Sequence, residues 1–157
     1  MKLDETNTLR EMSDVLVEVC ASGLPKCGTI PPTVFIRHDD KIGIGYLADG
    51  IDDAVLAKVD EMATSLGCHL MGATMEAWMA NYDKGQDTSV RPSERDDKRE
   101  IVVIGTGDRK GDVLVRAFAI NRDSEGKPSL GDEIQRDAGS FGGRIHDLLA
   151  GKPTTKH

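Results

Sequence analysis

The chain has 157 residues, of which 38% are hydrophobic and 30% charged, and it carries a net charge of −7 at pH 7. A chain of this length buries ~68–70% of its unfolded surface, so we expect one globular domain over residues 1–150 and a flexible tail over residues 151–157. The acidic balance disfavours direct nucleic-acid binding. The lack of ~18 consecutive apolar residues or of a signal-peptide core argues against a membrane span and indicates a cytoplasmic protein.

The first expected helix covers residues 4–21. Its apolar residues recur every three or four positions, as on the face of a helix that packs against a core: Leu9, Met12, Leu16 and Val19, with Val15 and Cys20 beside them. Gly23 and Pro25 are expected to end this helix, and residues 23–32 are interpreted as a connector.

A second helix is expected after residue 51, with Asp52 or Asp53 as its N-cap and Gly67 as its C-terminal cap. One stripe at helical spacing predicts its buried face: Val55, Val59, Met62 and Leu66. Ser140 is expected to cap a third helix, whose apolar residues are Phe141, Ile145, Leu148 and Leu149.

Two strand hairpins are expected. The first joins residues 33–37 to residues 41–47, and the second joins residues 100–106 to residues 112–121 across the turn GTGDRKG. Because this glycine-rich turn links two strands, it fits neither a Walker loop nor a dinucleotide-binding turn, both of which lead into a helix. Residues 129–135 are expected to add a short strand.

Residues 70–82 are expected to form a central strand, because both of its faces are largely apolar. In the strand 41–47, Gly43 and Gly45 leave one face almost bare, which indicates close approach of a helix or of a partner backbone. The chain is thus expected to have an α+β fold, with three helices packed on a mostly antiparallel or mixed sheet of about five strands. The following residues are expected to be buried together: Val59, Met62, Met75, Ala77, Val103 and Val115.

The cysteines Cys20, Cys27 and Cys68 are expected to be reduced thiols, because their number is odd and no secretion signal accompanies them. Their spacing does not match that of a zinc knuckle, and the neighbours Cys68 and His69 would point to opposite sides of a strand. We therefore expect no metal site and no cofactor.

Glu76 and the only tryptophan, Trp78, lie in the strand expected over residues 70–82. A carboxylate in an apolar strand is costly unless it is paired, so one interpretation is an ion pair with Arg91, Arg99 or Arg116, or a position at the rim of the sheet. The alternatives are a general acid or base with a raised pKa beside Trp78, or a role in binding.

The segment RPSERDDKRE (residues 91–100) alternates basic and acidic side chains, and Ser93–Asp96 matches a capping box that predicts a helical turn over residues 93–99. It is interpreted either as a self-paired, solvated turn or as a binding loop held between two strands. As a binding loop it contributes these candidate residues: Arg91, Glu94, Arg95, Lys98 and Arg99.

The tetrapeptides EAWM (76–79), RPSE (91–94) and DKRE (97–100), followed by LGD (130–132), form one pattern. This pattern resembles that of small uncharacterised proteins of bacterial and phage genomes, over roughly residues 33–135. The resemblance implies relatedness and supports the fold outline, and it brings no assigned activity.

The sequence therefore predicts a non-catalytic protein-binding or inhibitory module whose partner is another protein or a second copy in a homodimer. One concrete version is a phage or mobile-element protein that blocks a host defence system by binding its nucleoprotein complex. The alternative is a small hydrolase or nucleotide-processing enzyme that uses Glu76 with the loop arginines. A cleft where Glu76 meets arginine or histidine side chains would favour the enzyme, and an exposed apolar or charged patch would favour the binding module.

Overall fold

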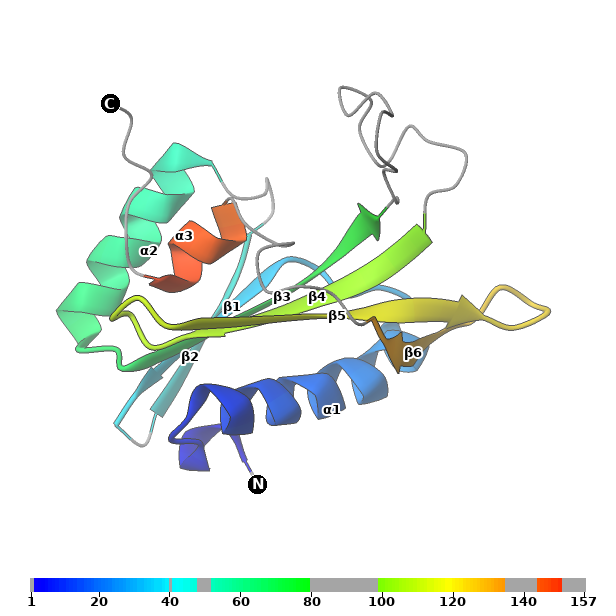
Figure 1. Ribbon diagram of the computed structural model, residues 1–157, viewed down its shortest axis with the longest axis horizontal. Coiled ribbons are helices and arrows are strands. Elements are labelled where there is room, and N and C mark those ends of the chain that lie inside the picture. The colour runs from blue at the N-terminus through cyan, green and yellow to red at the C-terminus, as the bar shows by residue number, and fades with distance from the viewer. Residues whose placement is uncertain (1, 40, 48–51, 80–98, 135–143, 151–157) are drawn as a thin grey trace.

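The computed structural model describes residues 2–39, 41–47, 52–79, 99–134 and 144–150. These residues form a six-stranded antiparallel sheet in the order β2-β1-β3-β4-β5-β6. Helix α1 covers one face of the sheet, and helices α2 and α3 lie over the other (Figure 1). The expected α+β class and antiparallel sheet are confirmed, with one strand more than the five expected.

The strands are β1 (Thr33–His38), β2 (Lys41–Tyr46), β3 (Leu70–Met79), β4 (Arg99–Gly107), β5 (Val113–Arg122) and β6 (Pro128–Glu133). The helices are the short 3-10 helix η1 (Leu3–Glu5) and the α-helices α1 (Leu9–Cys27), α2 (Asp53–Leu66) and α3 (Arg144–Ala150). Both expected hairpins, the central strand and the short strand after residue 128 are therefore confirmed. Ser140 and Phe141, expected at the start of the third helix, lie outside the described residues.

Helix α1 is shifted along the chain relative to the helix expected over residues 4–21. The expected start is wrong, because residues 3–5 form the separate helix η1. Helix α1 begins after the N-cap Thr8, continues through Gly23 and Pro25, and ends at Cys27, with Gly28 as its C-cap at a φ of 79°. The prediction that Gly23 and Pro25 end the helix is wrong. Leu24 is fully buried against the sheet, and burying a leucine stabilises by ~1.5–3 kcal/mol, which is comparable to the ~3 kcal/mol cost of an interior proline.

Helix α2 has the expected ends, since Asp52 accepts a hydrogen bond from the Val55 N–H at 2.8 Å and Gly67 forms a left-handed C-cap. Its buried face is only partly the expected one, since Val59 is buried and Val55 is half-buried beside it. The side chains that pack into the core are Leu56, Val59 and Ala63. The predicted burial of Met62 and Leu66 is wrong, because the helix is rotated so that both remain exposed.

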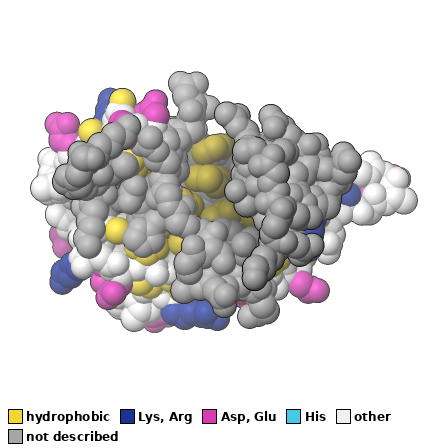
Figure 2. All heavy atoms as spheres, turned by 45° about the horizontal axis from the view of Figure 1, so that its top comes forward, with side chains coloured by type: hydrophobic (Ala, Val, Ile, Leu, Met, Phe, Trp, Pro, Cys, Tyr) yellow, Lys and Arg dark blue, Asp and Glu magenta, His cyan; other side chains and the backbone are white. Residues whose placement is uncertain are grey.

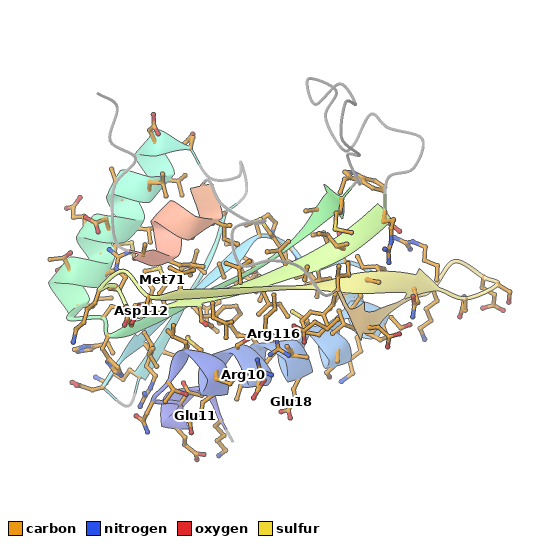
Figure 3. The ribbon with its side chains drawn as sticks, viewed as in Figure 1. Arg10, Glu11, Glu18, Met71, Asp112 and Arg116 are labelled. Carbon is orange, nitrogen blue, oxygen red and sulfur yellow. The ribbon has the colours of Figure 1, made fainter. Side chains whose placement is uncertain are left out.

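The sheet separates the core into two sides, and β3 contributes residues to both. On the α1 side, a Cβ added at Gly72 would lie 2.6 Å from Leu16, so this glycine permits close helix packing. On the other side, Met71 and Ala73 pack beneath α2 and α3 (Figure 3).

Val103 belongs to a third cluster over β3–β5, which half-buried Met75, Ala77 and Val115 complete. The core residues expected on β3–β5 thus group together, whereas Val59 lies in the neighbouring cluster.

Candidate functional site

Glu76 is exposed on β3, at the end of the sheet to which α1 leads. Its carboxylate accepts hydrogen bonds from the Thr29 hydroxyl at 3.0 Å and from the Ile30 N–H at 3.3 Å. This exposed position agrees with the interpretation of Glu76 as a rim residue. The pairing of Glu76 with Arg116 is wrong, because Arg116 is engaged elsewhere. Glu76 instead holds the segment after α1 against the sheet.

Trp78 is exposed and lies opposite Glu100 in the pairing of β3 with β4. Glu100 accepts two hydrogen bonds of 2.8 Å from the guanidinium of Arg122, and this contact lowers the pKa of Glu100. Arg99 is exposed and begins β4 instead of ending a helical turn. The remaining candidates from the loop lie outside the described residues: Arg91, Glu94, Arg95 and Lys98.

Two arginines act as structural braces: Arg37, which the sequence did not single out, and Arg116, which was expected to pair with Glu76 instead. Arg37 on β1 is buried and donates to the backbone carbonyls of Asp4, at 2.7 Å, and of Thr6. One of its nitrogens also lies 3.2 Å from Nε2 of His69. Arg37 therefore fixes the segment before α1 onto the sheet near β2, through backbone acceptors.

Arg116 on β5 lies between the sheet and α1 (Figure 3). Its guanidinium donates to Glu133 of β6 at 2.7 and 3.2 Å, and to Ser13 and Asp14 of α1 at 3.1 and 2.9 Å. The hydrogen bond from Arg116 is the main reason that the pKa of Glu133 is lowered. Arg116 thus ties β6 and α1 to the same strand.

The cysteines are free thiols in the structure. Cys20 lies on the buried stripe of α1, and burial raises its pKa from 9.0 to about 11. Cys68 lies directly before β3, and burial raises its pKa too. The expected positions of Cys20 and Cys68 are confirmed. Among the described residues, no three His, Cys, Asp or Glu side chains are grouped so that they could hold a metal ion.

A groove with a volume of about 510 Å³ lies between β2 and α2. Its lining is mostly apolar and includes the α2 stripe that was expected in the core: Val55, Val59, Met62 and Leu66. Gly43 and Gly45 form part of the lining from β2. Figure 2 turns the side with α2 and α3 toward the viewer and shows hydrophobic side chains at its surface.

The two glycines explain why this groove is open. A Cβ added at Gly45 would meet nothing within 4 Å, and one at Gly43 would meet only Ile36, at 3.9 Å. Strand β2 therefore brings no side chain into the space beneath α2. The expected close approach of a helix to these glycines is wrong, because α2 packs over β1 and β3 through Leu56 and Ala63. Whether a partner backbone lies there stays a prediction.

The backbone of β2 faces β1 on one side and the outer edge of the sheet on the other. Leu47 donates its N–H to the carbonyl oxygen of Pro32 at 2.8 Å. Because hydrogen-bonding direction alternates along an antiparallel strand, the backbone groups of Ile42, Ile44 and Tyr46 point outward. Strand β2 is the last in the sheet order, so no strand among the described residues satisfies these groups.

Comparison with known proteins adds no assignment, since no family model, curated protein or solved structure matches this chain. Within the described part of the chain, no helix combines the length and the apolar character needed to cross a membrane.

Proposed function

We propose that this protein is a non-catalytic protein-binding module whose docking site is the outer edge of β2 together with the adjoining groove. The observation that carries the proposal is the combination of outward-pointing backbone groups on β2 with an apolar groove of about 510 Å³ beside it. An edge strand offers main-chain hydrogen bonds to an added strand, and adjacent pockets select its side chains.

The distribution of exposed apolar side chains supports this site. Of the six large hydrophobic residues exposed in the described part of the chain, four lie on β2 or line the groove: Ile44 (58% exposed), Tyr46 (72%), Met62 (45%) and Leu66 (42%). Ile44 and Tyr46 lie on the α1 face, like Phe35 opposite Ile44, whereas Met62 and Leu66 line the groove on the other face. Exposed apolar side chains thus flank the open edge on both faces of the sheet, and apolar groups gathered at one place mark an interaction surface.

The more specific hypothesis is that the partner belongs to a host defence system that a phage or mobile-element protein blocks. Its support is the sequence resemblance, and it stays a prediction within the wider proposal. The binding loop over residues 91–100 and the enzyme built on Glu76 also stay predictions. The exposed position of Glu76 and its bonds to Thr29 and Ile30 favour a structural role for this carboxylate.

A comparative capture experiment tests the docking site. The wild type, Ile44→Lys and Val19→Lys are immobilised and exposed to the same host lysate, and bound proteins are quantified by mass spectrometry. Val19 is a matched control because it is also an exposed aliphatic residue, and it lies on helix α1. We expect Ile44→Lys to lose its partner by about tenfold or more, because a lysine at the edge disfavours strand addition. Val19→Lys should retain the partner.

Two further variants separate the alternatives in the same experiment. If capture survives Ile44→Lys and is lost in Arg95→Ala, the partner binds the loop, and the β2 edge is not the docking site. If no partner depends on either position but a hydrolytic activity disappears in Glu76→Gln, the enzyme hypothesis replaces the binding module.

A further inference from the structure

We infer that the strand added to β2 comes from a second copy of this chain, so that two sheets join across a twofold axis at Ile44. This inference rests on the proposed docking site and names its occupant. In an antiparallel pair centred on Ile44, each Ile44 faces its counterpart, and Ile42 faces Tyr46 of the second copy. A twofold interface needs one surface that is complementary to itself, and this stretch of β2 meets that requirement.

The backbone supports this register. The outward-pointing residues of β2 are Ile42, Ile44 and Tyr46, and a pair centred on Ile44 places each of them opposite another outward-pointing residue. Each such pair exchanges two backbone hydrogen bonds. A pair centred on Gly43 or Gly45 keeps the same side chains on each face. It leaves one outward-pointing residue at an end of β2 with no β2 residue of the second copy opposite it. Centring on Ile44 therefore satisfies the most backbone groups.

The side chains support it on both faces of the sheet. Ile42 lies opposite Arg37 and Ile44 lies opposite Phe35, so both isoleucines are on the α1 face of the sheet. On this face the second copy would add isoleucine–isoleucine and isoleucine–tyrosine pairs. Cross-strand pairs of aromatic and β-branched residues stabilise antiparallel sheets. On the other face, Gly43 would oppose Gly45, and the two grooves would join over a floor of glycines. The α2 stripes of the two copies would then line one shared cavity.

Charge does not oppose the pairing at β2 itself. Strand β2 contains no acidic residue, and its one charged residue, Lys41, would lie beyond the paired outward-pointing residues, opposite Leu47. The pairing therefore places no like charges directly opposite each other. Elsewhere the two copies repel, because each carries a net charge of −7. Added salt screens this repulsion and leaves apolar contacts in place, so association should strengthen with ionic strength.

Sedimentation equilibrium on the purified full chain tests the inference. We expect the wild type to approach twice the monomer mass of 17.0 kDa as its concentration rises, with tighter association at about 0.5 M salt than at about 0.05 M. Ile44→Lys, which would place two lysines on the axis, should weaken association by about tenfold or more, whereas Val19→Lys should behave as the wild type. A far-ultraviolet circular dichroism spectrum shows whether each variant is folded.

Oxidative crosslinking tests the register. In a Cys27→Ser background, which removes the exposed native thiol, Ile44→Cys should crosslink across the axis, because directly paired Cα atoms lie about 5.5 Å apart and disulfides span about 4.4–6.8 Å. Ile42→Cys should crosslink much more slowly, because its counterpart lies about four residues further along the strand, or about 14 Å away. Equal rates at the two positions would overturn the register.

The two proposals fail in different ways. A wild type that stays monomeric at high concentration and high salt overturns the self-pairing inference. The docking site would still stand if that monomer captured a different protein in an Ile44-dependent manner. Loss of association in Val19→Lys but not in Ile44→Lys would overturn the self-pairing inference and would place the contact on α1.

Discussion

The two edges of this sheet are built differently. Strand β6 begins with Pro128 and ends with Asp132 and Glu133, and its pairing with β5 is irregular between Phe118 and Ile120. Proline, charged residues and irregular pairing are the usual means by which proteins prevent an edge strand from accepting another strand. The β6 edge is therefore protected.

The β2 edge lacks most of these protections, and its one charged residue, Lys41, lies at its start. Between Ile42 and Tyr46 it contains neither proline nor charge, and its pairing with β1 is regular over the whole strand. Because one edge of the same sheet is protected and the other is open, the open edge is a local property of β2 and not a consequence of the fold. This contrast points to β2 as the binding edge.

The two edges also rest on different braces. Near β2, buried Arg37 bonds to backbone carbonyls. Near β6, Arg116 bonds to the carboxylates of Glu133 and Asp14. Backbone carbonyls do not titrate and carboxylates do, so protonation of Glu133 in acid should weaken the β6 brace.

The largest effect is expected for Gly45→Pro. By the alternation along β2, the N–H of Gly45 points toward Val34 of β1, which is buried. Proline removes this donor and leaves a buried carbonyl unsatisfied, so we expect a loss of about 3 kcal/mol in the free energy of unfolding. Urea denaturation measures the loss. A variant as stable as the wild type would show that Gly45 faces outward.

Arg37→Met should have the next largest effect. The substitution keeps most of the buried volume but removes the donors to the carbonyls of Asp4 and Thr6. We expect a loss of about 2 kcal/mol, because the orphaned carbonyl of Thr6 is buried and costs about 1–3 kcal/mol, whereas that of Asp4 is only partly buried. Urea denaturation at pH 7 measures the loss. A variant as stable as the wild type would mean that Arg37 does not hold this segment in place.

The contacts of Arg37 and Arg116 could not be predicted from the sequence, whereas features with local signals could. The caps of α2 and the two hairpins could be predicted because their signals lie within a few neighbouring residues, such as Asp52 and Gly67. The bonds of Arg116 to α1 could not, because Ser13 and Asp14 are more than 100 positions away in the chain. No local pattern encodes such a contact.

The groove could be predicted only in part. The alternating glycines of β2 indicated a face almost without side chains, which was interpreted as close approach of a helix or a partner backbone. Helix α2, however, carries two overlapping apolar stripes that share Val59. One contains Leu56 and Ala63, and the other contains Met62 and Leu66. Their periodicity is the same, so only packing against the sheet decides which one is buried.

Arg116→Met should have a smaller effect that depends on pH. Glu133 is about one-third exposed and Asp14 is more than half exposed, so solvent screens these pairs, and we expect a loss of about 1–2 kcal/mol at pH 7. The folded-state pKa of Glu133 is lowered below 4.5, so its contribution is present above pH 4.5 and is lost as the pH falls through the folded-state value.

The stability difference between the wild type and Arg116→Met should therefore be largest at neutral pH and should shrink as the pH falls below about 4.5. Denaturation curves from pH 7 to pH 3 measure it. A difference that grows in acid would contradict the assignment of Glu133 as the titrating partner.

The smallest effect on stability, and the sharpest test of the open edge, is expected for Ile44→Pro. The N–H of Ile44 points outward, so proline here removes no hydrogen bond to β1. Proline is tolerated on an edge strand when its missing N–H would face solvent, and the free energy of unfolding should change by no more than about 1 kcal/mol. Ile44→Pro should therefore be mildly destabilised and Gly45→Pro severely destabilised, although the two positions are adjacent in β2.

Ile44→Pro should nonetheless abolish association, because the central pair of the proposed interface needs the Ile44 N–H as a donor from each copy. Urea denaturation and sedimentation equilibrium on the same sample measure both properties. A folded variant that remains monomeric supports pairing through the backbone of β2. If Ile44→Pro is as unstable as Gly45→Pro, both positions are needed for pairing with β1, and the edge is not open at Ile44. If it is stable and still associates, the two copies meet through side chains or another surface, and the contrast between β2 and β6 does not explain the assembly.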